Sequence, residues 1–131
     1  MKKFSNKKKV LLFSCILTTV TIIIIIFLLN PLWQPAPLIR ANMLNLTPKD
    51  TSMEEVIRVI KENWEWEGYI ADVGYLRQDV TPRVRIGEKS IKVFQGKYPF
   101  VIFYTYVTVY YGFDENDKLI DIWVWKDTPV L

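Results

Sequence analysis

The spacing of apolar residues divides the chain into two unlike parts. Residues 10–29 form an apolar run without a charge, whereas apolar and polar residues alternate over short distances through residues 49–131. A helix rises about 1.5 Å per residue, so this run reaches about 30 Å, the thickness of a bilayer's hydrocarbon core. The first pattern predicts a transmembrane helix, and the second predicts a small folded domain.

The charges beside the apolar run predict its orientation. Lysines precede it at positions 2, 3, 7, 8 and 9. Because basic residues next to a membrane span stay in the cytoplasm, residues 1–9 are expected to form a cytoplasmic tail. Asn30-Pro31 should end the helix, since proline disfavours helix at the residue before it, and Trp33 is placed for the membrane interface. We therefore expect a single-pass signal anchor with the N-terminus inside and the C-terminal domain outside.

Two other interpretations of the apolar run remain open. A cleaved signal peptide has an apolar region of roughly 7–15 residues, which is shorter than this run. A lipoprotein signal would end at Cys15, but most of the apolar residues follow this cysteine instead of preceding it. The retained anchor is the interpretation that we carry forward.

A proline-containing segment follows the apolar run. Pro31, Pro35, Pro37 and Pro48 lie within residues 30–48, which lack a clear periodicity. Prolines favour extended chain. We expect a linker over 30–48 that holds the domain, residues 49–131, a short distance from the bilayer.

The domain should begin with a helix. Asp50, Thr51 or Ser52 can cap it, because glutamates follow at the spacing of a capping box. Apolar residues then recur at the spacing of one helix face: Met53, Val56, Ile57 and Ile60. This pattern predicts an amphipathic helix that ends near Asn63 and packs on a sheet.

The remainder of the domain predicts β structure, because β-branched and aromatic residues alternate with polar ones. We expect strands at 66–72, 100–111 and 119–125, with 84–93 forming either a tight hairpin or one strand with a glycine bulge. Loops or turns are expected at 74–82, 96–99 and 114–117. The predicted fold class is α+β, with one amphipathic helix on an antiparallel sheet of three to five strands.

Charge and composition exclude several classes of partner and of chemistry. The net charge of +3 comes from the N-terminal lysines, because residues 30–131 hold 12 Lys and Arg against 14 Asp and Glu. We therefore expect no nucleic-acid partner. The chain has no histidine and its single cysteine, Cys15, lies in the apolar run. The usual general base, the Ser–His relay and the common zinc ligands are missing, so we expect no metal, cofactor or catalysis.

Carboxylates supply the only candidate chemistry. Glu65 and Glu67 would share a strand face about 7 Å apart, and with Asp72 they allow an alternative function as a carboxylate-dependent hydrolase. The acidic turn at 114–117 does not fit a calcium loop, because Leu119 stands where an EF-hand needs glycine. A small-ligand sensor, with an apolar pocket between helix and sheet, is a further alternative.

Aromatic residues form the strongest pattern left unexplained. Trp123 and Trp125 share one strand face, and Tyr104, Tyr106 and Tyr110 share one face of the neighbouring strand. On the sheet face away from the helix they would make a binding patch for a protein partner. The alternative is that they fill the core, and the register that decides between the two is not given by the sequence.

Two resemblances bear on this hypothesis. The stretches 86–93 and 111–126 resemble small, uncharacterised single-pass membrane proteins of spore-forming Gram-positive bacteria, which implies a bacterial cytoplasmic membrane and brings no known activity. Residues 46–56, with the later stretch 113–119, are similar to the outer-membrane assembly lipoprotein domain of the SmpA/OmlA type. That similarity implies a helix before a three-stranded antiparallel sheet and a binding role in the cell envelope. We therefore expect a membrane-anchored, extracytoplasmic binding or scaffolding module whose partners are the lipid bilayer and an envelope protein.

Overall fold

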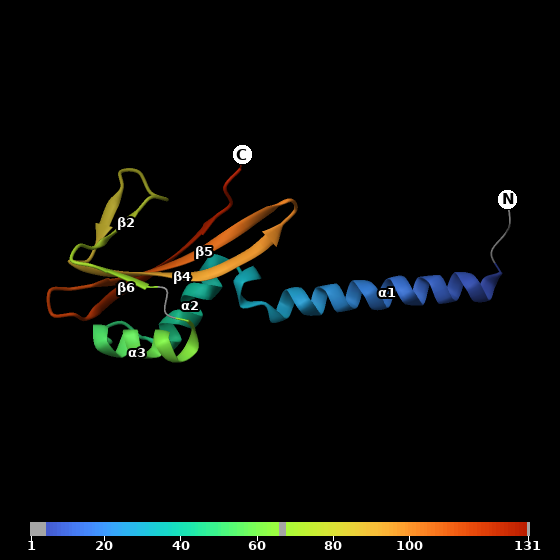
Figure 1. Cartoon of the computed structure of the whole chain (residues 1–131), viewed down its shortest axis with the longest axis horizontal. Coiled ribbons are helices and arrows are strands. Elements are labelled where there is room, and N and C mark those ends of the chain that lie inside the picture. Colours follow the sequence, from blue (N-terminus) through green and yellow to red (C-terminus); the bar gives the residue numbers. More distant parts are fainter. Residues whose placement is uncertain (1–4, 66–67, 131) are drawn as a thin grey trace. The chain divides into compact units, whose positions relative to one another are not determined.

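The computed structural model describes residues 5–65 and 68–130. The chain forms two compact units, Met1–Gln34 and Pro35–Leu131. The first holds α1 (Asn6–Leu29) and the short 3-10 helix η1 (Pro31–Trp33). Over its described residues, the second holds two helices and six strands. Figure 1 shows how these elements are arranged.

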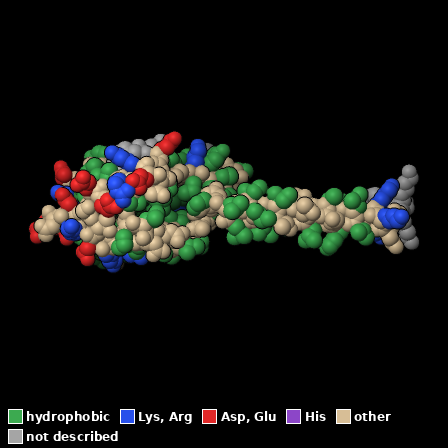
Figure 2. Space-filling view, turned by 90° about the horizontal axis from the view of Figure 1, so that it is seen from below, with side chains coloured by type: hydrophobic (Ala, Val, Ile, Leu, Met, Phe, Trp, Pro, Cys, Tyr) green, Lys and Arg blue, Asp and Glu red, His purple; other side chains and the backbone are tan. Residues whose placement is uncertain are grey.

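Helix α1 buries none of its residues. Figure 2 shows hydrophobic and uncharged side chains along its length and basic side chains at its N-terminal end. The hydroxyls of Thr18, Thr19 and Thr21 donate to carbonyls four residues earlier at 2.8–2.9 Å, which satisfies them within the helix. Within the described residues, α1 is the one helix long and apolar enough to cross a membrane.

The second unit is a layered α+β domain, as the sequence predicts. Four antiparallel strands form the main sheet in the order β1 (Gly68–Ala71), β4 (Lys89–Phe100), β5 (Phe103–Phe113) and β6 (Leu119–Asp127). Helices α2 (Ala36–Leu46) and α3 (Met53–Asn63) cover one face (Figure 1). A two-stranded sheet of β2 (Tyr75–Arg77) and β3 (Val84–Ile86) lies over the other face.

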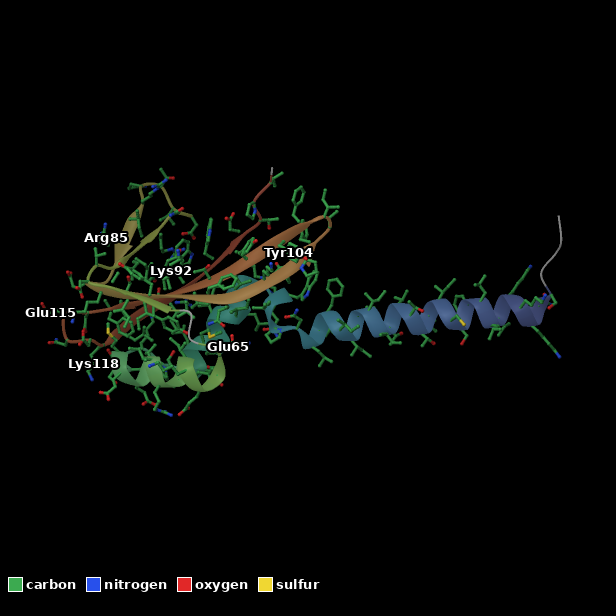
Figure 3. The ribbon with its side chains drawn as sticks, viewed as in Figure 1. Glu65, Arg85, Lys92, Tyr104, Glu115 and Lys118 are labelled. Atoms are coloured by element: carbon green, nitrogen blue, oxygen red, sulfur yellow. The ribbon has the colours of Figure 1, made fainter. Side chains whose placement is uncertain are left out.

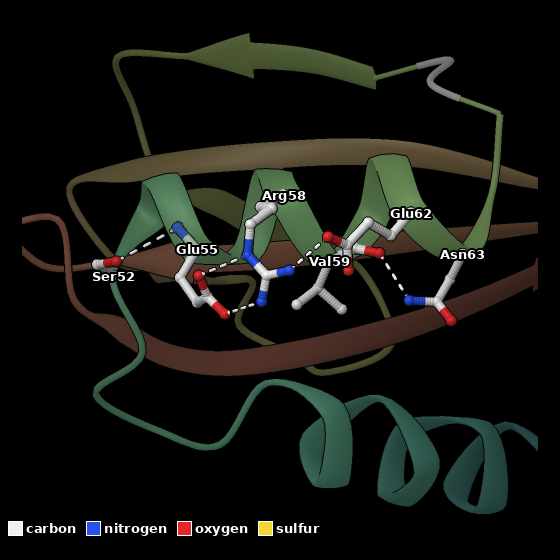
Figure 4. A network of polar contacts seen from close by, with 6 residues as sticks. All are labelled: Ser52, Glu55, Arg58, Val59, Glu62 and Asn63. Atoms are coloured by element: carbon white, nitrogen blue, oxygen red, sulfur yellow. Dashed lines mark hydrogen bonds and ion pairs between the residues drawn. The ribbon is translucent and has the colours of Figure 1, made fainter.

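The predicted amphipathic helix is α3, with the predicted end at Asn63. Ser52 caps it, its Oγ accepting from the Glu55 amide at 3.3 Å. Figure 4 shows the outer side of the helix, where Arg58 pairs with both Glu55 and Glu62. Arg58 lowers the pKa of Glu55 by its hydrogen bond. The inner side is buried at Val56, Val59 and Ile60.

Rows of apolar side chains across three strands form the helix-facing side of the sheet. Val93, Val109 and Val124 are direct neighbours in register, and the next row has the same arrangement, with Ile91, Tyr111 and Ile122. All six are at most 6% exposed. Tyr111 reaches α2, where its hydroxyl donates to Met43 Sδ at 3.7 Å. The core therefore joins both helices to the three longest strands.

The expected extended linker at 30–48 is wrong over most of its length, because α2 occupies 36–46. Pro35 and Pro37 fit the first turn of this helix, where backbone amides have no partner within the helix. Ile39 and Met43, one turn apart, are buried against the domain. The compact domain thus begins at Pro35 and not at residue 49.

The predicted turn at 96–99 is also wrong. Strand β4 continues through it to Phe100, with a register shift between Phe94 and Gly96 that leaves Gln95 as a bulge. The chain turns at Val101 and Ile102, inside the segment that the sequence predicts as an unbroken strand. Two aliphatic residues give no local turn signal.

The structure of residues 74–93 differs from the loop expected at 74–82 and from both the hairpin and the single bulged strand expected at 84–93. The expected loop contains β2, and β3 pairs with β2 instead of continuing into β4. Gly87 adopts a positive φ of 83°, and the next residue's amide donates to the Phe113 carbonyl at 2.8 Å. The chain therefore leaves the small sheet and enters the large one at this glycine.

The outer edge of β6 is partly occupied. Leu119 exchanges two backbone hydrogen bonds with Asp50 and Thr51, at 2.8 and 2.9 Å. Arg40 Nε donates to the Ile122 carbonyl at 2.8 Å, and its other nitrogen pairs with Asp121. Helix α2 and the turn before α3 are attached to the sheet through these contacts.

A bulge in β6 turns Ile120 away from the helices, although strict alternation along a strand would place it on the same face as Ile122. The register shifts between Gly112 and Phe113, which leaves Ile120 unpaired and 39% exposed, while Ile122 is 1% exposed.

We expect Ile122→Ala to lower the free energy of unfolding by about 2–4 kcal/mol, since it leaves a cavity in the core. Ile120→Ala is the matched control and should cost less than about 1 kcal/mol. Urea unfolding of the full chain in detergent micelles measures both, and equal losses would contradict the bulge.

Candidate functional site

Strand pairing places the predicted aromatic residues on one face of the sheet. Tyr110 lies opposite Trp123, and Thr108 lies opposite Trp125. Val109, between the two β5 residues, points to the helices, so these aromatic residues lie on the face away from α2 and α3. Tyr104 and Tyr106 are separated from Tyr110 by even numbers of residues along β5, so they lie on the same face. Figure 3 labels Tyr104 on this strand.

The inner part of this face is covered by the small sheet. The Tyr75 ring of β2 lies 5.8 Å from that of Tyr110 and stacks on Trp123 at 6.0 Å with 20° between the planes. A Cβ at Gly112 would lie 2.9 Å from Tyr75, so glycine at this position allows the close approach. Trp123 is 8% exposed. It belongs to a second core, and the accessible patch is smaller than the sequence predicts.

The outer part of the face remains open. Tyr104 is 50% exposed and Tyr106 is 38% exposed, while Tyr110 and Trp125 are half-buried. Phe94 of β4 adds its ring 6.1 Å from that of Tyr106. We name Phe94, Tyr104, Tyr106, Tyr110 and Trp125 the outer aromatic patch.

Lysines border the outer aromatic patch. Lys97 Nζ lies 4.6 Å from the centre of the Tyr104 ring, and Lys92 Nζ lies 5.8 Å from that of Tyr110. Both contacts lie within the range of cation–π attraction. Residues 89–113, which contain β4 and β5, carry three lysines and no acidic residue. The patch therefore offers aromatic surface with lysines on its β4 side, while the exposed Asp127 of β6 lies opposite Tyr106.

Sequence reasoning missed Phe94, Lys92, Lys97 and Tyr75. The alternating positions of Lys92 and Phe94 along the strand could have placed both on one face. The bulge at Gln95 changes the face on which Lys97 lies, and no residue near it signals a bulge. Tyr75 falls in a segment predicted as loop. Its role as a cover depends on contacts between segments far apart in the chain.

The candidate acidic site does not assemble among the described residues. Glu65 is exposed and lines a hollow of about 290 Å³ with Trp64, Phe94, Gln95 and Gly96, none of which is acidic. Asp72 is exposed in the turn after β1, and Glu67 lies outside the described residues. Within the described part of the chain, no group of three or more acidic, histidine or cysteine side chains could hold a metal ion.

Among the described residues, side chains fill the middle of the helix–sheet interface, where a sensor would need its pocket. Val56 and Ile60 of α3 and Ile91 and Val93 of β4 are all 0% exposed. These side chains form a close-packed interior, so the helix–sheet interface is part of the core.

Comparisons with known proteins add no further assignment. No family model matches the sequence, and neither a curated protein nor a solved structure matches the chain. The two resemblances stated for the sequence therefore stay predictions. Helix α1 and the outer aromatic patch are the two features of the molecule that bear on its function.

Burial raises the pKa of both Tyr75 and Tyr111 above the usual range of tyrosine. Their neutral hydroxyls are favoured in the folded state, so the stability that they contribute is full below pH 10 or so and falls as the pH rises further. In an ultraviolet titration of the full chain in micelles, these two tyrosines should ionise late, together with unfolding. Tyr75→Phe should reduce this late phase, because it removes one of the two tyrosines whose pKa is raised by burial. Absence of a late ionisation phase, with the folded circular dichroism signal retained at high pH, would contradict this assignment.

Proposed function

We propose that this chain is a single-pass membrane protein that presents a non-catalytic binding domain outside a bacterial cytoplasmic membrane. The observation that carries the proposal is the outer aromatic patch, because exposed aromatic residues gathered on one face are typical of protein-binding surfaces. The partner is an envelope protein that offers apolar and acidic side chains to this patch. The domain acts as a binding or scaffolding module.

The anchoring half of the proposal has separate support. Helix α1 runs for 24 residues and buries no side chain within the protein. In a bilayer its backbone and its threonine hydroxyls would be satisfied internally. The lysines before it favour a cytoplasmic N-terminus.

Cysteine labelling tests the orientation. In a Cys15→Ser background, a single cysteine at Glu115 should react with a membrane-impermeant maleimide added to intact cells, because the β5–β6 turn lies outside. A single cysteine at Lys7 is the matched control and should react only after permeabilisation. Reaction at position 7 and protection at position 115 would reverse the topology, and recovery of full-length chain in the soluble fraction would refute the anchor.

Photo-crosslinking tests the patch. A photoreactive amino acid at Tyr106 or at Trp125 should give the same single adduct in living cells. Glu62, exposed on the helix side, is the control position and should give none. The double change Phe94→Ser with Tyr106→Ser should weaken adduct formation from position 125 about 30-fold, as expected for the loss of interface hot spots. Circular dichroism must show the variant folded, and an unchanged adduct yield in that folded variant would contradict the proposal.

A further inference from the structure

The tip of the β4–β5 hairpin is made of exposed apolar residues. Val101 and Ile102 form its two-residue turn and are 86% and 82% exposed, and Phe100 before them is 53% exposed. Two-residue hairpin turns strongly favour residues such as Asn-Gly. Val101 has a positive φ of 56°, a conformation that β-branched residues rarely adopt. Neither the folding of the hairpin nor the solubility of the domain favours these residues here.

Side-chain chemistry along the hairpin changes in a fixed order away from this tip. The aliphatic turn comes first, then Phe100 and the half-exposed Tyr104, and then Lys97, whose ammonium lies over the Tyr104 ring. A bilayer presents the same order with decreasing depth: hydrocarbon, an interface that favours aromatic rings, and head groups that lysine side chains reach. Lys97 lies four strand positions from Val101, about 13 Å at 3.3 Å per residue. A tip that enters the upper acyl chains by roughly 5–10 Å would therefore leave the Lys97 backbone above the acyl chains, at the level of the head groups.

The charge of the hairpin is complementary to an anionic lipid surface. Lys97 is the lysine nearest the tip, and residues 89–113 contain no Asp or Glu; Lys89 lies at the other end of β5, where it pairs with Asp117. Acidic residues are instead gathered in the β5–β6 turn at Asp114, Glu115 and Asp117, the far end of β5 from the tip (Figure 3). Basic side chains near a bilayer are attracted to anionic head groups. The two ends of β5 therefore differ in their affinity for a membrane.

The covalent connection keeps the domain beside any bilayer that holds α1. Only residues 30–34 separate α1 from the domain unit, and five residues span at most about 18 Å when fully extended. A weak contact between tip and bilayer becomes effective under such a tether, since its local concentration is high.

We propose that the tip of the β4–β5 hairpin, residues 100–103, inserts into the interface of the bilayer that α1 spans. This second and reversible membrane contact holds the domain in one orientation. The inference rests on the anchoring half of the proposed function, and it commits to a lipid surface as the occupant of the tip.

Fluorescence quenching by lipid tests the insertion on the full chain. In a Cys15→Ser background, a single cysteine at Ile102 is labelled with an environment-sensitive dye, and the protein is reconstituted into phosphatidylethanolamine–phosphatidylglycerol vesicles. Emission should shift to the blue, and lipids with nitroxide groups on the acyl chains should quench most of it. The same dye at Glu115, at the other end of β5, is the control and should show neither effect. Equal quenching at the two positions would overturn the proposal.

A variant that favours the fold and removes the apolar tip separates insertion from stability. Val101→Gly with Ile102→Asn places glycine at the residue with positive φ, as a type II′ hairpin turn prefers, so the unfolding midpoint in micelles should not fall. A dye at Tyr104 should lose its quenching by lipid in this variant, and quenching that persists would overturn the proposal. Energy transfer between dyes at position 102 of two copies, without quenching by lipid, would assign the tip to a second copy and overturn it too. Failure of the chain to enter vesicles at all would instead refute the anchor, and with it both proposals.

Discussion

The antiparallel pairing of β5 with β4 and β6 is the constraint on which the rest of the domain depends. Side chains alternate along a strand, so one register places Val109 and Tyr111 towards the helices and Tyr106 and Tyr110 away from them. A shift by one residue would exchange the two sets and bury the tyrosines under α3. The helix-packed core and the open aromatic face are therefore two results of the same pairing.

Elements that depend on local signals were predictable from the sequence. The apolar run gives α1, the Ser52 cap and the apolar spacing give α3, and the Asp114 side chain, which accepts from the amides of Asn116 and Lys118 at 2.9 Å, gives the β5–β6 turn. Elements set by distant contacts were missed. The sequence of helix α2 predicts a proline-containing linker, because the contact between Met43 and Tyr111 that stabilises the helix joins residues far apart in the chain. The turn at Val101 contains no turn-forming residue.

The candidate site was predictable only in part, for the same reason. The sequence gives the parity of the tyrosines and tryptophans along their strands but not which strand faces which. It also cannot show that Tyr75, in an expected loop, covers Trp123 and removes it from the accessible surface. The bulge at Gln95 brings Lys97 beside Tyr104, and this arrangement exists only once β4 and β5 are paired.

The attachment of Arg40 to the edge strand β6 affects how neighbouring copies of the chain can pair when they are crowded together. An edge strand offers unpaired amides and carbonyls to which another chain can add. Along the first half of β6, Asp50, Thr51 and Arg40 already occupy these groups at Leu119 and Ile122. Many copies confined to two dimensions would meet edge to edge far more often than molecules in free solution, and this half of the strand gives them no starting point for a continuous intermolecular sheet.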